Sequence, residues 1–290
     1  MIEAQASRTA ERVARHRAAH QLLDEPPVLR DELAVAMLGP ATAAALRADP
    51  RAFETSRIAS FLRASMAARA RFAEDQLAAL RAGGLGQYVV LGAGLDTFAY
   101  RHPAPRPPLR VWEVDHPATQ AWKRQRLAEA GVAVPPHLTF VPLDFERRSL
   151  PAALAEAGFD VSAGALFAWL GVVPYLTVEA IRATLAFVAG ATRAGGGVVF
   201  DYLVAPEALS PLHRAVRERM AAVVAADGEP WRSDFAPAAL CAELRALGFA
   251  TAEDVPPETV NARYFANRAD GLRVGGLGHL MWAGAAPYAR

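Results

Sequence analysis

The stretch from residue 87 to residue 115 constrains the fold of this chain more than any other part of the sequence. An apolar run there leads into Gly92 and Gly94, and a second apolar run ends at Glu113 and Asp115. This spacing is typical of a βαβ unit, in which a glycine turn after the first strand lets a ligand approach the backbone. An acid about 20 residues further on can then accept hydrogen bonds from ribose hydroxyls. The stretch therefore predicts a site for an adenosine-bearing cofactor.

Two residues after the glycines indicate which cofactor fits. A dinucleotide-binding turn carries a third glycine three positions after the second, and this chain has Thr97 there. Asp96 adds a negative charge at the start of a helix, where it would repel a pyrophosphate. S-adenosylmethionine has an adenosine, no phosphate and a positive sulfonium, so these residues favour it over a nicotinamide dinucleotide. Because a short G-x-G motif is weak, a turn that only connects a strand to a helix stays an alternative.

Charge and composition narrow the range of partners. The chain has 290 residues and a formal net charge of +1, so no broad electrostatic field recruits nucleic acid or an anionic membrane. Its single cysteine, Cys241, cannot form an intrachain disulfide. The N-terminus lacks an apolar signal-peptide core, and no window reaches the roughly 18 apolar residues of a membrane span. We therefore expect a soluble cytoplasmic protein with no nucleic-acid or membrane partner.

Hydrophobic periodicity changes along the chain from helical to strand-like. Residues 1–82 show helical patterns at 10–23, 30–48 and 57–81, which predict an N-terminal helical cap. Five apolar runs then alternate with helical patterns, as in a parallel sheet that is covered on both faces. The runs span residues 88–91, 109–114, 138–142, 163–169 and 197–204, and the helical patterns between them span 117–130, 150–157 and 178–192.

The last third of the chain predicts two further helices and two closing strands. The helices are expected at 206–226 and 237–247, and the strands at 249–255 and 278–283. The complete pattern predicts an α/β fold: a Rossmann-like, seven-stranded, mostly parallel sheet with helices on both faces. Because no long linker occurs, we assign residues 1–290 to one domain. Its parts are a helical cap at 1–82, a cofactor-binding core at 83–204, and a substrate lid with closing strands at 205–290.

Five motifs follow one another in the first two thirds of the chain. They are ARARF at 68–72 with Asp75, YVVLGAGLDTFAYR from residue 88, VWEVDHPATQAWKRQRL from residue 111, PLDFE at 142–146 and FAWLGVVPYLT from residue 167. In this order they resemble the leucine carboxyl methyltransferase-like family of class I S-adenosylmethionine-dependent methyltransferases. The resemblance covers about residues 57–204 and implies S-adenosylmethionine as cofactor. Leu170 stands where the family often has an acid, which leaves the role of that position open.

The resemblance also implies cofactor contacts for single residues. Arg71 would pair with the carboxylate of the cofactor, as suits a guanidinium fork, although a solvated helix arginine is the alternative. Gly92 and Gly94 would lie against the methionine part. Asp144 would meet the adenine edge, with a simple turn aspartate as the alternative. Phe145 beside it would offer a backbone N–H or a ring face.

The residue that contacts the ribose stays open between two acids. The resemblance implies Asp115, but Glu113 lies two residues earlier and so on the same face of a strand. Helix capping is a further alternative, because Pro117 begins a helical pattern and either Asp115 or His116 can serve as its N-cap.

The sequence does not determine the catalytic residue. Methyl transfer from a sulfonium is an in-line displacement. A carboxylate acceptor is already ionised and needs no base, whereas a phenol with a pKa near ~10 would benefit from one. Tyr175, just beyond the fourth apolar run, and His116 are the candidates, and His213 and His279 are further histidines that could act as a base. No metal-ligand spacing occurs, so we expect no metal.

The substrate would be a small-molecule methyl acceptor. Trp169, Trp231 and Phe235 could form an aromatic wall for it, beneath a lid that includes the loop 227–235, although a tryptophan can also simply be a large core residue. The leading hypothesis is an S-adenosylmethionine-dependent O-methyltransferase of a carboxylate or phenol, for example in polyketide-type secondary metabolism. The alternatives are a protein C-terminal carboxyl methyltransferase, an NAD-dependent oxidoreductase, and a non-catalytic binding protein on the same fold. The acceptor and the oligomeric state are left open.

Overall fold

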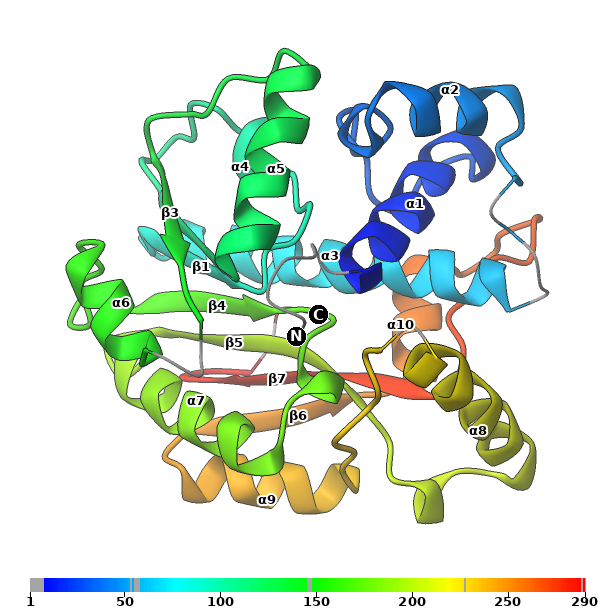
Figure 1. The fold of residues 1–290 in the computed structure, drawn as a ribbon. Helices are drawn as coiled ribbons and strands as arrows, with labels where there is room; N and C mark the ends of the chain where they lie inside the picture. Colours follow the sequence, from blue (N-terminus) through cyan, green and yellow to red (C-terminus); the bar gives the residue numbers. More distant parts are fainter. Residues whose placement is uncertain are drawn as a thin grey trace.

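A seven-stranded sheet lies at the centre of the computed structural model, which describes residues 8–52, 54, 58–144, 148–226, 228–287 and 289 (Figure 1). Its strands run in the order β3-β2-β1-β4-β5-β7-β6. All neighbours pair in parallel except β7, which is antiparallel to both β5 and β6. The strands are β1 Gln87–Leu91, β2 Arg110–Asp115, β3 Leu138–Pro142, β4 Ala165–Trp169, β5 Gly196–Leu203, β6 Thr251–Val255 and β7 Gly278–Gly284.

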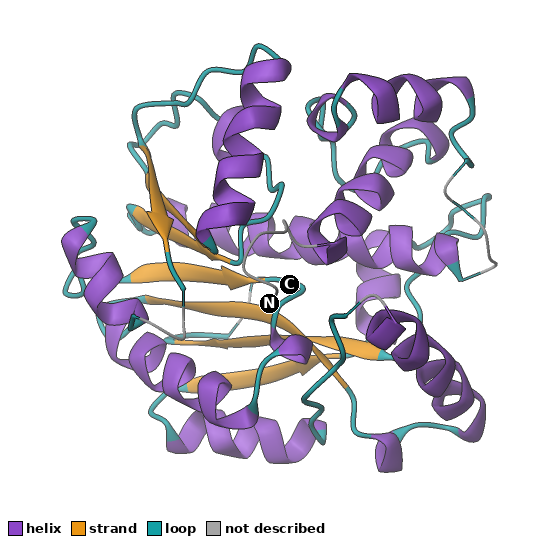
Figure 2. Ribbon diagram, viewed as in Figure 1, coloured by secondary structure: helices purple, strands orange, loops and turns teal. Residues whose placement is uncertain are grey.

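Helices cover both faces of this sheet, as Figure 2 shows. On one face, α1 (Arg8–Leu23), α3 (Ala59–Ala82), α5 (Pro117–Glu129) and α10 (Pro257–Tyr264) contribute to one apolar cluster. On the other face, α6 (Leu150–Glu156), α7 (Val178–Ala191) and α9 (Pro237–Ala246) contribute to a second cluster. The short α4 (Phe98–Arg101) follows the glycine turn, and α8 (Pro211–Ala226) lies beyond β5. The predicted α/β fold class is confirmed.

The central strands are apolar on both sides because both sides are buried. Along β1, Tyr88 and Val90 belong to the first apolar cluster, whereas Val89 and Leu91 belong to the second. Every residue of β1 and β4 is buried. This arrangement explains why the sequence shows continuous apolar runs rather than an alternation of apolar and polar residues.

The N-terminal cap differs from the prediction at one place. The helix expected at 30–48 is divided into a 3-10 turn, η1 (Ala36–Leu38), and α2 (Pro40–Ala48). Gly39 between them has φ 81, a left-handed conformation that ends a helix, and Pro40 then begins the next one. The cap packs α1 against α3 above the sheet (Figure 1), while its status as a separate part of the domain stays a prediction.

Two smaller differences concern the C-terminal third. The helix expected from residue 206 begins at Pro211, because residues 206–208 form a separate 3-10 turn, η3 (Pro206–Ala208). The helix α10 was not predicted. Among the described residues, no helix combines the length and the apolar composition needed to cross a membrane.

Candidate functional site

A cavity of about 780 Å³ opens at the carboxyl ends of the parallel strands. Residues that follow β1, β2, β3 and β4 form its floor, and residues of α1, α3 and the segment 228–232 form its walls. The sheet order reverses between β1 and β4, since β2 lies on one side of β1 and β4 on the other. Ligands of open α/β sheets bind at such a switch point, so this cavity is the candidate site.

The glycine turn after β1 is held tightly against its neighbours. Gly92 and Gly94 have φ 68 and 47, in the left-handed region that favours glycine. The backbone N–H of Gly92 donates to the carbonyl of Val114 at 2.8 Å. A Cβ on Gly92 would lie 2.3 Å from Cγ2 of Val172, in the loop after β4. Glycine is therefore required here for two reasons, the backbone conformation and the close approach.

Asp115 at the end of β2 faces this turn. Its Oδ2 accepts a hydrogen bond from the N–H of Gly94 at 2.5 Å, and its Oδ1 accepts one from the N–H of His116 at 2.7 Å. Burial raises the pKa of Asp115, although these two N–H groups act in the opposite direction. The carboxylate thus lies in the cavity beside the glycine turn, in a position fixed by the backbone.

His116 caps the helix that follows. Its Nδ1 accepts a hydrogen bond from the N–H of Ala118 at 3.2 Å, and Pro117 occupies the first helical position of α5. The cap thus uses the lone pair of Nδ1. His116 does line the cavity, but its geometry favours the capping alternative over the role of a base.

Glu113 lies outside the cavity in a buried cluster. Its Oε2 is 2.6 Å from Nζ of Lys123 and accepts a hydrogen bond from the hydroxyl of Tyr100 at 3.3 Å. Burial raises the pKa of Glu113 to about 7, although Lys123 acts in the opposite direction. Of the two acids considered for the ribose, only Asp115 therefore reaches the cavity.

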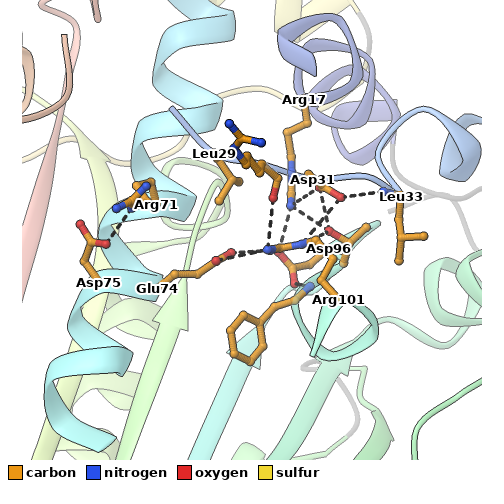
Figure 3. Close-up of polar contacts among 12 residues, drawn as sticks. Arg17, Leu29, Asp31, Leu33, Arg71, Glu74, Asp75, Asp96 and Arg101 are labelled. Atoms are coloured by element: carbon orange, nitrogen blue, oxygen red, sulfur yellow. Dashed lines mark hydrogen bonds and ion pairs between the residues drawn. The ribbon is translucent and has the colours of Figure 1, made fainter. Parts of the chain in front are cut away.

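Arg71 is also placed away from the cavity, which corrects the expectation for this residue. Figure 3 shows Arg71 turned toward Asp75, with its Nε 2.7 Å from Oδ1 of Asp75. Arg71 lines a separate cavity of about 420 Å³ near Arg263. Arg69, two positions earlier on α3, lines the main cavity instead, and its Nη1 is 2.8 Å from Oδ2 of Asp201. Residues two apart on a helix point in nearly opposite directions, so only one arginine of ARARF can face the site.

The other predicted residues divide into two groups. Asp144 and Tyr175 line the cavity, and the Tyr175 hydroxyl lies 3.5 Å from Oγ1 of Thr9 on α1. Phe145 lies outside the described residues, so its place is not assigned. The residues that do not line the cavity are His213, His279, Trp169, Trp231 and Phe235.

The expected aromatic wall is therefore wrong. Trp169 is buried in the core beneath the sheet, and the ring of Phe235 packs edge-on against Tyr202. His279 is engaged with Asp254, whose Oδ2 is 2.9 Å from its Nδ1. In the described part of the chain, no group of three or more His, Cys, Asp or Glu residues could hold a metal ion.

Sequence comparison places the chain in a known family. Residues 10–189 match the family model described as leucine carboxyl methyltransferase. The chain belongs to the leucine carboxyl methyltransferase family. This membership confirms the predicted family and its enzyme class, a methyltransferase that depends on S-adenosylmethionine.

Relatives of this family member come from several bacteria. The protein named "Putative S-adenosyl-L-methionine-dependent methyltransferase YktD" of Bacillus subtilis (strain 168) is 38% identical over 207 residues, which cover 71% of this chain and 67% of that one. A protein of Mycobacterium avium (strain 104) with the same description, apart from YktD, is 36% identical over 53% of this chain and 49% of its own. The chain thus spans two thirds of the Bacillus relative and about half of the mycobacterial one.

Solved structures support the fold of this family member. A crystal structure from Thermobifida fusca YX has a TM-score of 0.53 at 20% identity and covers 93% of both chains. The apo form of the S-adenosylmethionine-dependent methyltransferase SibL has a TM-score of 0.50 at 16% identity, over 78% of this chain and 58% of that one. At these identities the likeness shows the fold alone.

Sequence reasoning missed the ionic network that joins the cap of this leucine carboxyl methyltransferase family member to its glycine turn (Figure 3). Arg17 on α1 places Nη1 3.0 Å from Oδ2 of Asp96 and Nη2 2.7 Å from Oδ2 of Asp31. Nη2 also donates to Oγ1 of Thr97, which in turn donates to Asp31. Arg17 therefore compensates much of the charge on Asp96, so the repulsion of a pyrophosphate is weaker than the sequence indicated. An arginine 79 positions away carries no local signal that could have revealed this pair.

Proposed function

We propose that this protein transfers a methyl group from S-adenosylmethionine to an oxygen of a small-molecule carboxylate or phenol. The observation that carries the proposal is the contact between Asp115 and the backbone N–H of Gly94, inside a cavity at the switch point of the sheet. Family membership gives the enzyme class, and the cavity is the proposed site for the cofactor and the acceptor. We further propose that the acceptor belongs to polyketide-type secondary metabolism and that the protein is cytoplasmic.

The residues that line the cavity fit the parts of this cofactor. A carboxylate offers about four lone-pair positions, so Asp115 keeps acceptor capacity for two ribose hydroxyls after accepting two backbone N–H groups. Asp144 follows β3, where it can accept from the exocyclic amine of adenine. Arg69 would face the amino-acid carboxylate through the nitrogens that do not contact Asp201. Gly92 and Gly94 would lie against the methionine part.

The chain itself has to orient the acceptor and exclude water. When bound, S-adenosylmethionine supplies an electrophilic methyl group, which passes to the acceptor oxygen as the sulfur becomes a neutral thioether. A carboxylate acceptor loses no proton, and a phenol releases one. We assign Tyr175 the role of positioning the acceptor, because its hydroxyl lines the cavity near Thr9. Alignment of this kind and a closed cavity are the main contributions a protein makes to such a displacement.

The size of the cavity supports a small acceptor. Ligand sites of about 300–1,000 Å³ hold one cofactor-sized or drug-sized molecule with most of its surface buried. The cavity of about 780 Å³ lies within this range, so beside the cofactor it leaves room only for a small acceptor. A protein C-terminus as acceptor, a nicotinamide cofactor and a non-catalytic role are the alternatives, and the following experiment separates the last two from the proposal.

Calorimetric titration tests the proposal. We expect wild-type protein to bind S-adenosylhomocysteine at micromolar concentration and NAD much more weakly. Exchange of Asp115→Asn or Asp144→Ala should weaken S-adenosylhomocysteine binding about tenfold or more, because each removes a charged hydrogen-bond acceptor worth roughly 1.5–3 kcal/mol. Asp160→Asn, in an exposed turn, is the matched control and should leave binding unchanged. Binding of NAD alone would contradict the proposal. If S-adenosylhomocysteine binds, isotope-labelled methyl transfer into extracted metabolites separates a catalytic from a non-catalytic protein.

A further inference from the structure

Three arginines line the main cavity, and one of them differs from the other two. Arg17 is paired with Asp31 and Asp96, and Arg69 is paired with Asp201. The guanidinium of Arg232 makes no hydrogen bond and no ion pair with any residue that the structure describes, although its charge acts weakly on Glu179. Two of the three positive charges are therefore used inside the protein, and the third is available to a ligand.

Glu179, in the first turn of α7, interacts only weakly with the charge of Arg232. The pKa of the exposed Glu179 is lowered first by its own backbone N–H and by the hydroxyl of Thr177, and Arg232 is the smallest of the causes. Glu229, three positions before Arg232, has its own contact. Its Oε2 accepts the N–H of Thr9 at 2.9 Å, at the first turn of α1, where the helix dipole favours an anion.

The backbone holds Arg232 in a fixed place beside Tyr175. Its N–H donates to the carbonyl of Pro174 at 2.7 Å, within the 3-10 turn η2 (Val173–Tyr175). The buried Ser233 adds a hydrogen bond from its hydroxyl to the carbonyl of Val173 at 2.9 Å. The two residues are thus tied to the same turn, although Arg232 itself is exposed and lies where the cavity meets solvent.

Apolar side chains also line the cavity that Tyr175 and Arg232 share. They are Val13, Met66, Val172, Leu176 and Pro230. An acceptor in this space would therefore have an apolar body, with any charge at the end that reaches Arg232. A guanidinium fork suits a carboxylate in a bidentate geometry.

We propose that Arg232 selects a methyl acceptor that carries a carboxylate at the end opposite its methylated oxygen. This inference rests on the proposed function and names its substrate class. The carboxylate on Arg232 is a recognition group and not the reacting group, because two hydrogen bonds from a guanidinium stabilise its negative charge and so make both of its oxygens poorer nucleophiles. The methylated product therefore keeps its negative charge.

Methyl transfer to fractionated metabolites tests this inference. A bacterial metabolite extract is separated by anion exchange at pH 8 into retained and unretained fractions, and each is incubated with the protein and isotope-labelled S-adenosylmethionine. We expect label in the retained fraction, and we expect the labelled product to be retained again. In the active fraction, Arg232→Gln should raise KM for the acceptor about tenfold or more, as for the loss of a charged hydrogen bond. Arg232→Lys should restore part of the loss.

A control variant and a binding measurement separate failure of this inference from failure of the proposed function. Arg219→Gln on the exposed side of α8 is the matched control and should leave KM unchanged. Calorimetry with S-adenosylhomocysteine should give equal affinities for wild type and Arg232→Gln. Label only in the unretained fraction, a product that has lost its charge, or an unchanged KM in Arg232→Gln would each overturn the inference while the proposed function stands. Failure of wild-type protein to bind S-adenosylhomocysteine would instead overturn the proposed function and this inference with it.

Discussion

Gly92 and Asp115 show how single residues shape the candidate site. Gly92 brings the loop after β1 into contact with Val172, and Asp115 fixes the next glycine of the turn through its N–H. The Asp115 side chain from β2 thus positions the backbone of the glycine turn, and the same hydrogen bond fixes that side chain.

Exchange of Gly92→Ala should destabilise the protein by about 2–4 kcal/mol, which combines the cost of a left-handed alanine with that of overpacking. The measurement is the free energy of unfolding in urea. Gly84→Ala provides the control, because Gly84 has φ 94 but nothing within 4 Å of a Cβ. It should show only the backbone cost of about 1–2 kcal/mol. Equal losses in the two variants would show that the contact with Val172 carries no energy.

Sequence patterns predicted some site residues and not others, for physical reasons. Gly92, Gly94 and Asp115 are local to one βαβ unit, so their spacing alone places them together. The choice between Arg69 and Arg71 depends on which way α3 faces, and an alanine-rich helix with arginines at alternate positions does not reveal that. Residues from distant segments, such as Arg17 and Arg232, meet the site only through tertiary packing.

At the scale of elements, α1 is the wall of the cavity that faces the glycine turn. Thr9, Ala10, Val13, Ala14 and Arg17 line the cavity at the spacing of one helical stripe. A Cβ on Gly94 would lie 3.3 Å from the Cβ of Ala10, so the helix and the turn are close. The pattern of residues 10–23 predicted this helix, but not the surface that it covers.

Removal of the Arg17 guanidinium should loosen α1 from the turn. Arg17→Met removes the ion pair of 2.7 Å with Asp31, whose other partner, Arg101, is 3.7 Å away. Loss of one member of a buried pair costs about 3–5 kcal/mol. We expect this loss in urea unfolding, together with weaker binding of S-adenosylhomocysteine. Arg182→Gln removes an exposed pair with Glu243 and should cost at most about 1 kcal/mol. A loss no larger than this in Arg17→Met would contradict the role given to the network.

Acid should also weaken the attachment of α1, because of His16. Burial, with Arg63, Arg12 and Arg69 nearby, lowers the pKa of His16 to about 4. The unfolded chain therefore binds a proton below about pH 6.5 that the folded protein takes up only near pH 4. The stability this group contributes is present above pH 6.5 and is lost as the pH falls toward 4, by up to about 3 kcal/mol.

Urea unfolding at a series of pH values measures this effect. His16→Gln should lose about 3 kcal/mol less than wild type between pH 7 and pH 4, because the titrating group is gone. If His16→Gln follows the wild-type curve, His16 is not the group responsible.

At the scale of the whole molecule, the sheet brings the ends of four parallel strands to one cavity. The fold class and the seven strands followed from the periodicity of the sequence, because buried parallel strands and the helices between them leave strong patterns. The break at Gly39 and the helix α10 did not follow from it, because the signals there are single residues, Gly39 with Pro40 and Pro257, and not a hydrophobic period. The assignment of residues 205–290 as a lid with closing strands stays a prediction.

The central claim is that the cavity beside Gly92 and Gly94 holds S-adenosylmethionine. The most direct measurement is a crystal structure of the protein with S-adenosylhomocysteine. The account predicts the ligand in this cavity, with ribose hydroxyls on Asp115 and the amino-acid carboxylate on Arg69. A ligand bound in the cavity near Arg71 and Arg263, with the glycine turn left free, would contradict it.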